Sequence, residues 1–175
     1  LKILPTVGDV DWTPEFRQIL TRDAPELRLR ALEHLAEHGC PDDAHAVAGL
    51  LGHCDPCVRA EAITTLMAIS DADPLEDIEP CLDDPAVEPR SAAIACLVNS
   101  GDLDRLLAAG TALKALLESG DTSERRGAAE ALARIKRGGL VRPLVSLLED
   151  DDPEVVRAAL RACRAQPDHL LLPII

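Results

Sequence analysis

Apolar residues recur along the chain at the spacing of one helix face, and this pattern repeats. Phe16, Ile19 and Leu20 stand at positions i, i+3 and i+4, which is one apolar stripe of an α-helix. The same triplet returns with its first residue at Val47, Ile78, Leu113 and Leu144. The successive offsets are 31, 31, 35 and 31 residues.

A second pattern lies between these stripes and keeps the same offsets. An arginine recurs at one of its positions, in Arg28, Arg59, Arg90 and Arg125. Three residues further on, an alanine recurs in Ala31, Ala62, Ala93, Ala128 and Ala159. Two independent patterns that share the same offsets indicate a sequence repeat.

Each repeat is predicted to be helix A, a turn, helix B and a second turn. Helix A is predicted to begin at Asp-Pro pairs, in which Asp caps the helix and Pro is its first residue. These pairs are Asp55-Pro56, Asp84-Pro85 and Asp152-Pro153, and Asp121 with Glu124 forms a capping box. Glycines end helix A at Gly39, Gly101 and Gly138-Gly139.

Neither helix can bury its apolar stripe alone, so neighbouring repeats must stack. We therefore predict an all-α fold, an α-α superhelix (solenoid) of about five two-helix repeats. After an N-terminal segment (1–12), a single array is expected over 13–175. Its predicted parts are a partial repeat (13–22), four repeats (23–54, 55–83, 84–119 and 120–151) and a truncated last repeat (152–175). Both ends of the array are expected to be cut from a longer protein.

The register makes specific statements about burial. The last leucine of the helix B stripe is expected to be almost fully buried, namely Leu51, Leu82, Leu117 and Leu148, whereas Ala48, Glu79 and Lys114 are expected to be accessible. The third repeat is the most irregular. It has two extra residues near Pro89, Pro80 inside helix B, and a long connection predicted from Asp102 to Thr111.

The chain resembles the HEAT-like repeats of the phycobilisome lyase type, whose helix A reads D-P-x-V-R-x-x-A-x-x-x-L. Arg125-Arg-Gly-Ala-Ala-Glu-Ala-Leu132 and the segment from Leu144 to Val155 are close matches. The resemblance covers about 13–175 and implies that the recurring arginine pairs with an Asp of a neighbouring turn. It also implies the alternative function, a bilin lyase or isomerase that handles a chromophore. The His-Glu iron ligands of HEAT-like deoxyhypusine hydroxylases are missing here, since Ala60-Glu61 and Arg126-Gly127 stand in their place.

Charge and composition narrow the function. The formal net charge is −13, and residues 1–104 hold 21 acidic and 7 basic residues. Such a charge repels nucleic acid and anionic membranes, and the chain has no Tyr, one Trp and one Phe for stacking on bases. No run of 18 apolar residues occurs. The excess of Arg over Lys suggests a bacterial source, and the irregular cysteine spacing suggests a reducing cytoplasm.

Candidate chemistry is sparse. Cys54 and Cys57 form a CxxC at a helix start, a motif that serves redox chemistry or half a zinc site, but no second CxxC accompanies it. We interpret it as incidental, and expect no metal, cofactor or catalytic residue. His34, His38 and Cys40 remain a minor three-ligand alternative. Cys81 and Cys163 are expected to act as small buried apolar residues.

The favoured function is a non-catalytic protein–protein interaction scaffold, or a regulatory module of a larger protein. Helix B is expected to line the concave face, with the binding residues beside its buried stripe. These are Arg17, Gln18, Ala48, Gly49, Glu76, Glu79, Asp83, Lys114, Ala115, Glu118, Val145 and Ser146. The small residues leave room for a helix or loop, and the carboxylates favour a basic or amphipathic protein or peptide partner.

Overall fold

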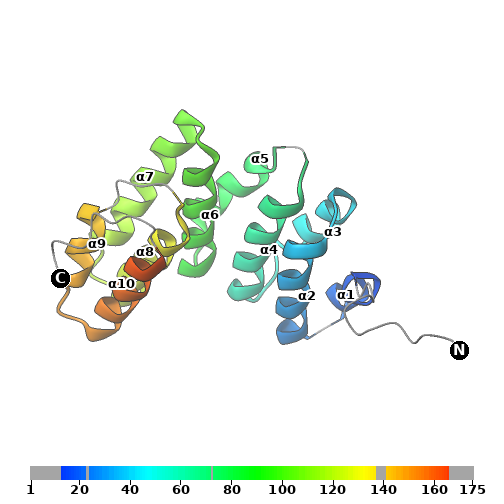
Figure 1. Cartoon of the computed structure of the whole chain (residues 1–175), viewed down its shortest axis with the longest axis horizontal. Helices are drawn as coiled ribbons and strands as arrows, with labels where there is room; N and C mark the ends of the chain where they lie inside the picture. Colours follow the sequence, from blue (N-terminus) through cyan, green and yellow to red (C-terminus); the bar gives the residue numbers. More distant parts are fainter. Residues whose placement is uncertain (1–12, 23, 72, 137–140, 166–175) are drawn as a thin grey trace, which may run out of the picture. The chain divides into compact units, whose positions relative to one another are not determined.

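The computed structural model describes residues 13–22, 24–71, 73–136 and 141–165. These residues form α-helices and short 3-10 helices, with no β-strand among them (Figure 1). The predicted fold class, an all-α array of two-helix repeats, is confirmed. The chain divides into two compact units, residues 1–72 and 73–175, and each unit is described by itself below.

The first unit is built around two long helices A. Its elements are α1 (Thr13–Leu20), α2 (Pro25–His38), the 3-10 helix η2 (Pro41–Asp43), α3 (Ala44–Ala48) and α4 (Pro56–Ile69). The helices A, α2 and α4, pack against each other, while α1 packs on α2 and α3 packs on α4. Thr65 strengthens the contact between the helices A, because its buried hydroxyl donates a 3.1 Å hydrogen bond to the Leu32 carbonyl.

The second unit continues the alternation of helices A and B. Its elements are α5 (Leu75–Ile78), the 3-10 helix η3 (Glu79–Asp83), α6 (Val87–Ser100), α7 (Leu103–Leu117), α8 (Thr122–Arg134), α9 (Val141–Leu148) and α10 (Pro153–Ala165). The helices A form a continuous row, since α6 packs on α8 and α8 packs on α10. The η3 segment and α7 lie against α6, and α9 lies against α10.

The predicted starts of helix A are confirmed in three repeats. Asp55 and Asp121 each cap a helix by accepting a 2.8 Å hydrogen bond from the backbone N–H two residues on, and Asp152 does the same before α10 at 2.7 Å. The prediction for Asp84-Pro85 is wrong. That helix begins two residues later, at Val87 after the cap residue Ala86, and Asp84 stands two residues before this cap, where its carboxylate accepts from the Ala86 N–H.

Glycine ends helix A where the backbone demands it. Gly101 follows α6 with φ of 84°, a left-handed conformation that side chains with a Cβ rarely adopt. Gly39 follows α2 in an extended conformation. The predicted ends at Gly138-Gly139 lie outside the described residues.

Helix B varies more than the sequence pattern suggests. Pro80 interrupts it as predicted, because the α-helix ends at Ile78 and a 3-10 helix continues over Glu79–Asp83. The predicted long connection from Asp102 to Thr111 is wrong. Asp102 caps α7 by accepting from the Arg105 N–H at 3.0 Å, and the helix runs without a break from Leu103 to Leu117. The inserted residues therefore lengthen helix B.

The core confirms the register of helix A. The alanine that recurs in every repeat is fully buried in all five helices A, at Ala31, Ala62, Ala93, Ala128 and Ala159. Small residues at this position let the helices A approach one another closely. Asn99 links two neighbouring helices A at their ends, since its amide donates to the Arg134 carbonyl and its carbonyl accepts from the Lys136 N–H.

None of the helices in the described ranges is both long enough and apolar enough to span a membrane.

Candidate partner-binding surface

In the first unit, the predicted binding residues lie on α1 and at the end of α3. Arg17 and Gln18 are exposed on α1, while Ala48 is the half-buried last residue of α3 and Gly49 follows it in the open. Gly49 has room for a side chain, because a Cβ there would approach only backbone oxygens at 3.4 Å or more. The end of α3 thus carries small residues, Ala48 and Gly49, and α1 carries the longer exposed side chains of Arg17 and Gln18.

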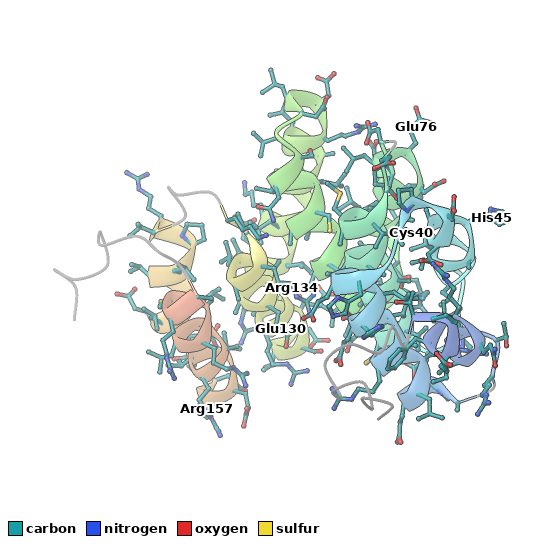
Figure 2. The ribbon with its side chains drawn as sticks, turned by 45° about the vertical axis from the view of Figure 1, so that its right-hand side comes forward. Cys40, His45, Glu76, Glu130, Arg134 and Arg157 are labelled. Atoms are coloured by element: carbon teal, nitrogen blue, oxygen red, sulfur yellow. The ribbon has the colours of Figure 1, made fainter. Side chains whose placement is uncertain are left out.

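Arg17 is already engaged by the chain itself. Its guanidinium donates two hydrogen bonds to Asp43, from Nε at 2.5 Å and from Nη2 at 3.0 Å, and Nη2 also lies 3.3 Å from Cys40 Sγ. Cys40 is labelled in Figure 2. Asp43 is 5% exposed, and the bonds from Arg17 hold its pKa below the usual value. Arg17 therefore fixes η2 against α1 and is only partly available to a partner.

In the second unit, the predicted acidic residues gather on one short segment. Glu76 lies on α5, and Glu79 and Asp83 lie on η3, all three exposed to solvent. Figure 2 shows the Glu76 side chain directed away from the ribbon. Among the described residues, neither Glu76 nor Asp83 takes part in an ion pair. The segment therefore presents carboxylates to solvent.

Sequence reasoning missed the residue that holds this acidic segment beside α7. Arg105 Nη1 lies 2.7 Å from Asp73 Oδ2, and Arg105 Nε lies 3.9 Å from Glu79 Oε2. The bond from Arg105 also holds the pKa of Asp73 below its usual value. Because Arg105 falls in the stretch that was predicted to be a connection, its position on a helix face could not be anticipated.

The remaining predicted residues lie on α7 and α9. Lys114 and Ala115 are exposed on the last turn of α7 and Glu118 is exposed directly after it, and the Lys114 ammonium lies 3.7 Å from the Glu118 carboxylate. On α9, Ser146 is exposed and Val145 is half-buried. The structure packs η3 against α7, and the ion pairs of Arg105 tie the acidic segment to the start of α7, whereas Lys114, Ala115 and Glu118 lie at its other end. The α9 residues follow beyond α8, which contacts both α7 and α9.

Comparison with known families accounts for this architecture. The family model for HEAT repeats matches residues 13–98 and 110–174. The chain belongs to the HEAT-repeat family. The matched segments include helix pairs of both units, and the gap between them falls on the inserted residues that lengthen α7. The finer resemblance, to the phycobilisome lyase type, stays a prediction.

Solved structures similar to the chain include engineered and designed proteins. An engineered protein, structural genomics target OR329, is 25% identical with a TM-score of 0.51, and the match covers 89% of this chain and 79% of that one. A second, target OR366, is 25% identical with a TM-score of 0.49 and coverages of 89% and 81%. A designed armadillo repeat protein, solved in complex with the peptide (KR)4, is 22% identical with a TM-score of 0.46 and coverages of 89% and 82%. The search of curated proteins found no match.

The HEAT repeats use their recurring arginine as a structural ladder. Arg125 binds Asp150 at the next turn through two hydrogen bonds, of 2.6 and 3.1 Å, which matches the pairing that the resemblance implied. Arg28 reaches the equivalent position three repeats earlier, where His53 Nε2 lies 2.5 Å from its Nη1. Arg90 instead pairs with Glu124 at 2.7 Å. The arginines are thus tied into the turns and do not form an open anion-binding row.

The helix B register needs one correction. Leu51, Leu82, Leu117 and Leu148 are half-buried, and not almost fully buried as predicted. The buried positions are the first of the stripe, at Val47, Ile78, Leu113 and Leu144, and in the later repeats the second, at Leu116 and Leu147. Leu51, Leu117 and Leu148 come at or after the last residue of their α-helix, and Leu82 lies in η3, beyond the end of α5. Glu79 and Lys114 are exposed as predicted, and Ala48 is half-buried.

The candidate metal ligands are not brought together. No group of three His, Cys, Asp or Glu residues in the described part of the chain could hold a metal ion. His34 stacks on Phe16 with ring centroids 4.1 Å apart and tilts against His38 at 4.7 Å, so it belongs to an aromatic cluster. Cys40 instead lies beside Arg17 and Asp43.

The cysteines differ in burial from the prediction. Cys54 and Cys57 are exposed at the start of α4. Cys81 and Cys163 are half-buried, so their interpretation as buried apolar residues was wrong. Cys81 lies in the exposed η3 segment, and no helix A beyond α10 is described that would cover Cys163. The buried thiol is that of Cys96 on α6, where burial raises the pKa to about 11.

Proposed function

We propose that this chain is a non-catalytic protein-binding scaffold, or a regulatory module of a larger protein. One observation carries the proposal: residues beside the buried stripe of helix B are open to solvent in successive repeats, on helices whose other face is already in the core. Glu79 and Lys114 are exposed while Ile78 and Leu113 are buried. A row of such helices offers a partner a long surface, and exposing this surface leaves the apolar stripe in the core.

The charge of this surface favours one class of partner. Between residues 73 and 119 there are ten acidic and three basic residues, a net charge of −7. Glu76, Asp77 and Asp83 are exposed, and no ion pair joins them to other described side chains. A basic or amphipathic segment supplies the missing positive charge, and complementary potentials speed association and select partners.

A peptide library displayed on phage tests this proposal. We expect selection on the wild-type chain to enrich peptides rich in Lys and Arg with interspersed apolar residues. A variant with Glu76→Lys, Glu79→Lys and Glu118→Lys should lose these peptides, because it replaces the attractive charges by repulsive ones. Circular dichroism would show that the variant is still folded.

A matched control keeps the change in net charge equal and moves it elsewhere. Glu26, Glu33 and Glu37 are exposed on α2, a helix A, and their replacement by Lys should leave the selected peptides bound. If the folded α5–α7 variant and this control bind equally well, the proposed surface is wrong. If wild-type selection enriches no peptide class, the protein-binding function itself is contradicted.

A further inference from the structure

The first turns of α7 expose two leucines that the fold does not use. Leu103 and Leu107 are 69% and 64% exposed, the highest values for large apolar side chains among the described residues. They are four residues apart, so they lie one above the other on the same face of the helix. Large apolar side chains that stay in water side by side mark an interaction site more often than isolated ones do.

This exposed face continues along the entire helix. Gly110, Lys114 and Glu118 follow Leu107 at helical spacing and are also exposed. The opposite face carries the packing of α7, because Ala109, Leu113 and Leu116 are buried and α7 contacts α6 and α8. The face of α7 that begins with Leu103 therefore takes no part in the packing of the fold, and its first half is apolar.

Gly110 adds a second observation at the same place. It lies in the interior of α7, where glycine weakens a helix. A Cβ built on Gly110 would meet nothing within 4 Å, so no close approach among the described residues explains the glycine. A missing side chain directly after two exposed leucines leaves a low point where a partner's backbone can approach.

Acidic residues surround the apolar turns. Asp102 and Asp104 are exposed beside Leu103. The contacts of Arg105 with Asp73 and Glu79 hold the acidic segment of α5 and η3 at the same end of α7 but on another side of the helix, since Arg105 stands about 200° around it from Leu103. Arg105 is neutralised by these two carboxylates, so the charges next to Leu103 are the negative ones of Asp102 and Asp104. A second copy of this chain would bring the same negative charges to the contact and would be repelled.

We propose that the α7 face formed by Leu103, Leu107 and Gly110 binds a basic amphipathic helix of another protein. Apolar residues of that helix pack around the two leucines, its backbone passes over Gly110, and its Lys or Arg side chains reach Asp102 and Asp104. This proposal rests on the proposed scaffold function and names the anchor within that surface. Two apolar anchors surrounded by polar contacts are the usual arrangement of an interface centre.

A synthetic helical peptide is the probe. It carries leucines at i, i+4 and i+7 of one face and lysines on the other, and a control peptide has glutamates in place of the lysines. Wild-type chain should bind the lysine peptide and not the glutamate peptide, as measured by fluorescence anisotropy. The Leu103→Asp, Leu107→Asp double variant should bind the lysine peptide about tenfold or more weakly, the usual effect of losing an anchoring side chain. Gly110→Leu should also weaken binding of this peptide.

The aspartates separate apolar anchoring from charge. They add two negative charges to the surface, so a contact made by charge alone would become tighter with a basic peptide. Both leucines are exposed, which leaves the core of the variant unchanged. The matched control is Leu27→Asp with Leu160→Asp, since these leucines of α2 and α10 are also exposed, at 47% and 48%, and should leave the affinity unchanged.

Three other outcomes of these experiments would contradict the proposal. A folded α7 double variant that binds as tightly as the wild type removes the anchor. If the charge reversal at Glu76, Glu79 and Glu118 abolishes binding while the α7 variant does not, the scaffold function stands and the α7 site is wrong. Self-association of the wild type in analytical ultracentrifugation that is lost in the α7 variant would assign the face to a second copy.

Discussion

At the scale of single residues, one turn position recurs through the array and changes its side chain without changing its role. Two residues before the cap of helix A, a side chain accepts a hydrogen bond from the backbone N–H of the cap residue. His53, Asp84, Ser119 and Asp150 do this at 3.0, 2.8, 3.1 and 2.9 Å. The recurring arginine of the preceding repeat binds the same position at His53 and at Asp150. The turn is therefore held by both a backbone donor and a cation.

This position was hidden in the sequence because the repeat fixes the role and not the residue type. Imidazole, carboxylate and hydroxyl groups all accept a hydrogen bond, so three different residue types satisfy one geometry. The arginine is visible as a repeat because only a guanidinium reaches the turn with two parallel donors. Arg90 shows that the aligned position alone does not predict the partner. Ser119 stands at the position that Asp150 occupies in the next repeat, and Arg90 binds Glu124 instead.

The Arg125–Asp150 pair gives a prediction for pH. The bonds from Arg125 hold the pKa of Asp150 below its usual value of 3.8. A carboxyl whose pKa is lower in the folded state stabilises the fold above its unfolded pKa, and this contribution is lost as the pH falls through the folded pKa. Asp150→Asn should therefore lower the melting temperature at pH 7, and the difference from the wild type should shrink below about pH 4.

The control for this prediction lies next to it in the sequence. Asp151 is exposed and makes no ion pair within the described part of the chain, so Asp151→Asn should change the melting temperature little at any pH. Thermal unfolding of the three proteins between pH 7 and pH 3 gives the comparison. A difference for Asp150→Asn that persists unchanged at pH 3 would show that the ion pair is not its cause.

At the scale of elements, helix A was predictable in detail and helix B was not. Three of the five described helices A have a capping Asp at their start, and all five have a buried alanine at the same position, so the register of their apolar positions is fixed. Helix B is packed from one side and varies from the four residues of α5 to the fifteen of α7. The pattern i, i+3, i+4 leaves open which of its members faces the core most directly, and the prediction chose the wrong leucine.

Neighbouring leucines of α9 test the corrected register. Leu147 is 2% exposed, whereas Leu148 is half-buried at the end of the helix. Leu147→Ala should lower the free energy of unfolding by about 2–5 kcal/mol, the usual cost of a cavity in a packed core. Leu148→Ala should lower the free energy of unfolding clearly less, because part of the Leu148 side chain is already in contact with solvent. Urea titrations of both variants measure this, and equal losses would restore the original register.

Two glycines within helices should respond in opposite directions to the same substitution. Gly110→Ala should stabilise α7 by about 0.5–1 kcal/mol, since alanine favours a helix interior and its Cβ would meet no atom within 4 Å. Gly127→Ala should destabilise by about 1–3 kcal/mol, because overpacking strains a core and its Cβ would collide with Val87 and Ser91 of α6.

Urea titration of the two alanine variants measures both effects. A stabilised Gly110→Ala that also binds the lysine peptide less well would show that the glycine serves binding at the expense of stability. Loss of stability in Gly110→Ala would mean that this part of α7 is not a free helix face.

The length of the insertion in the third repeat could be counted from the sequence, but its form as a longer helix could not be predicted. Residues 102–111 contain no turn signal stronger than a single interior glycine.

At the scale of the whole molecule, composition predicted the kind of surface and could not predict its centre. A net charge of −13 points to basic partners. The exposed leucines of α7 contribute to the same apolar percentage as the buried ones, so composition cannot separate a binding face from a core. Only the helix on which Leu103 and Leu107 stand shows that they point away from the packing.

The chain as a whole is expected to need no metal ion. Structural zinc in proteins is held by four ligands at tetrahedral positions, and the described residues place no three possible ligands together. The apolar cores of both units already bury the helices A. We therefore expect a chelator to leave the melting temperature unchanged and zinc analysis to give far less than one ion per chain. Stoichiometric zinc that disappears when Cys54 and Cys57 are both changed to Ser would show instead that the exposed CxxC binds metal, with ligands from outside the described residues or from a second chain.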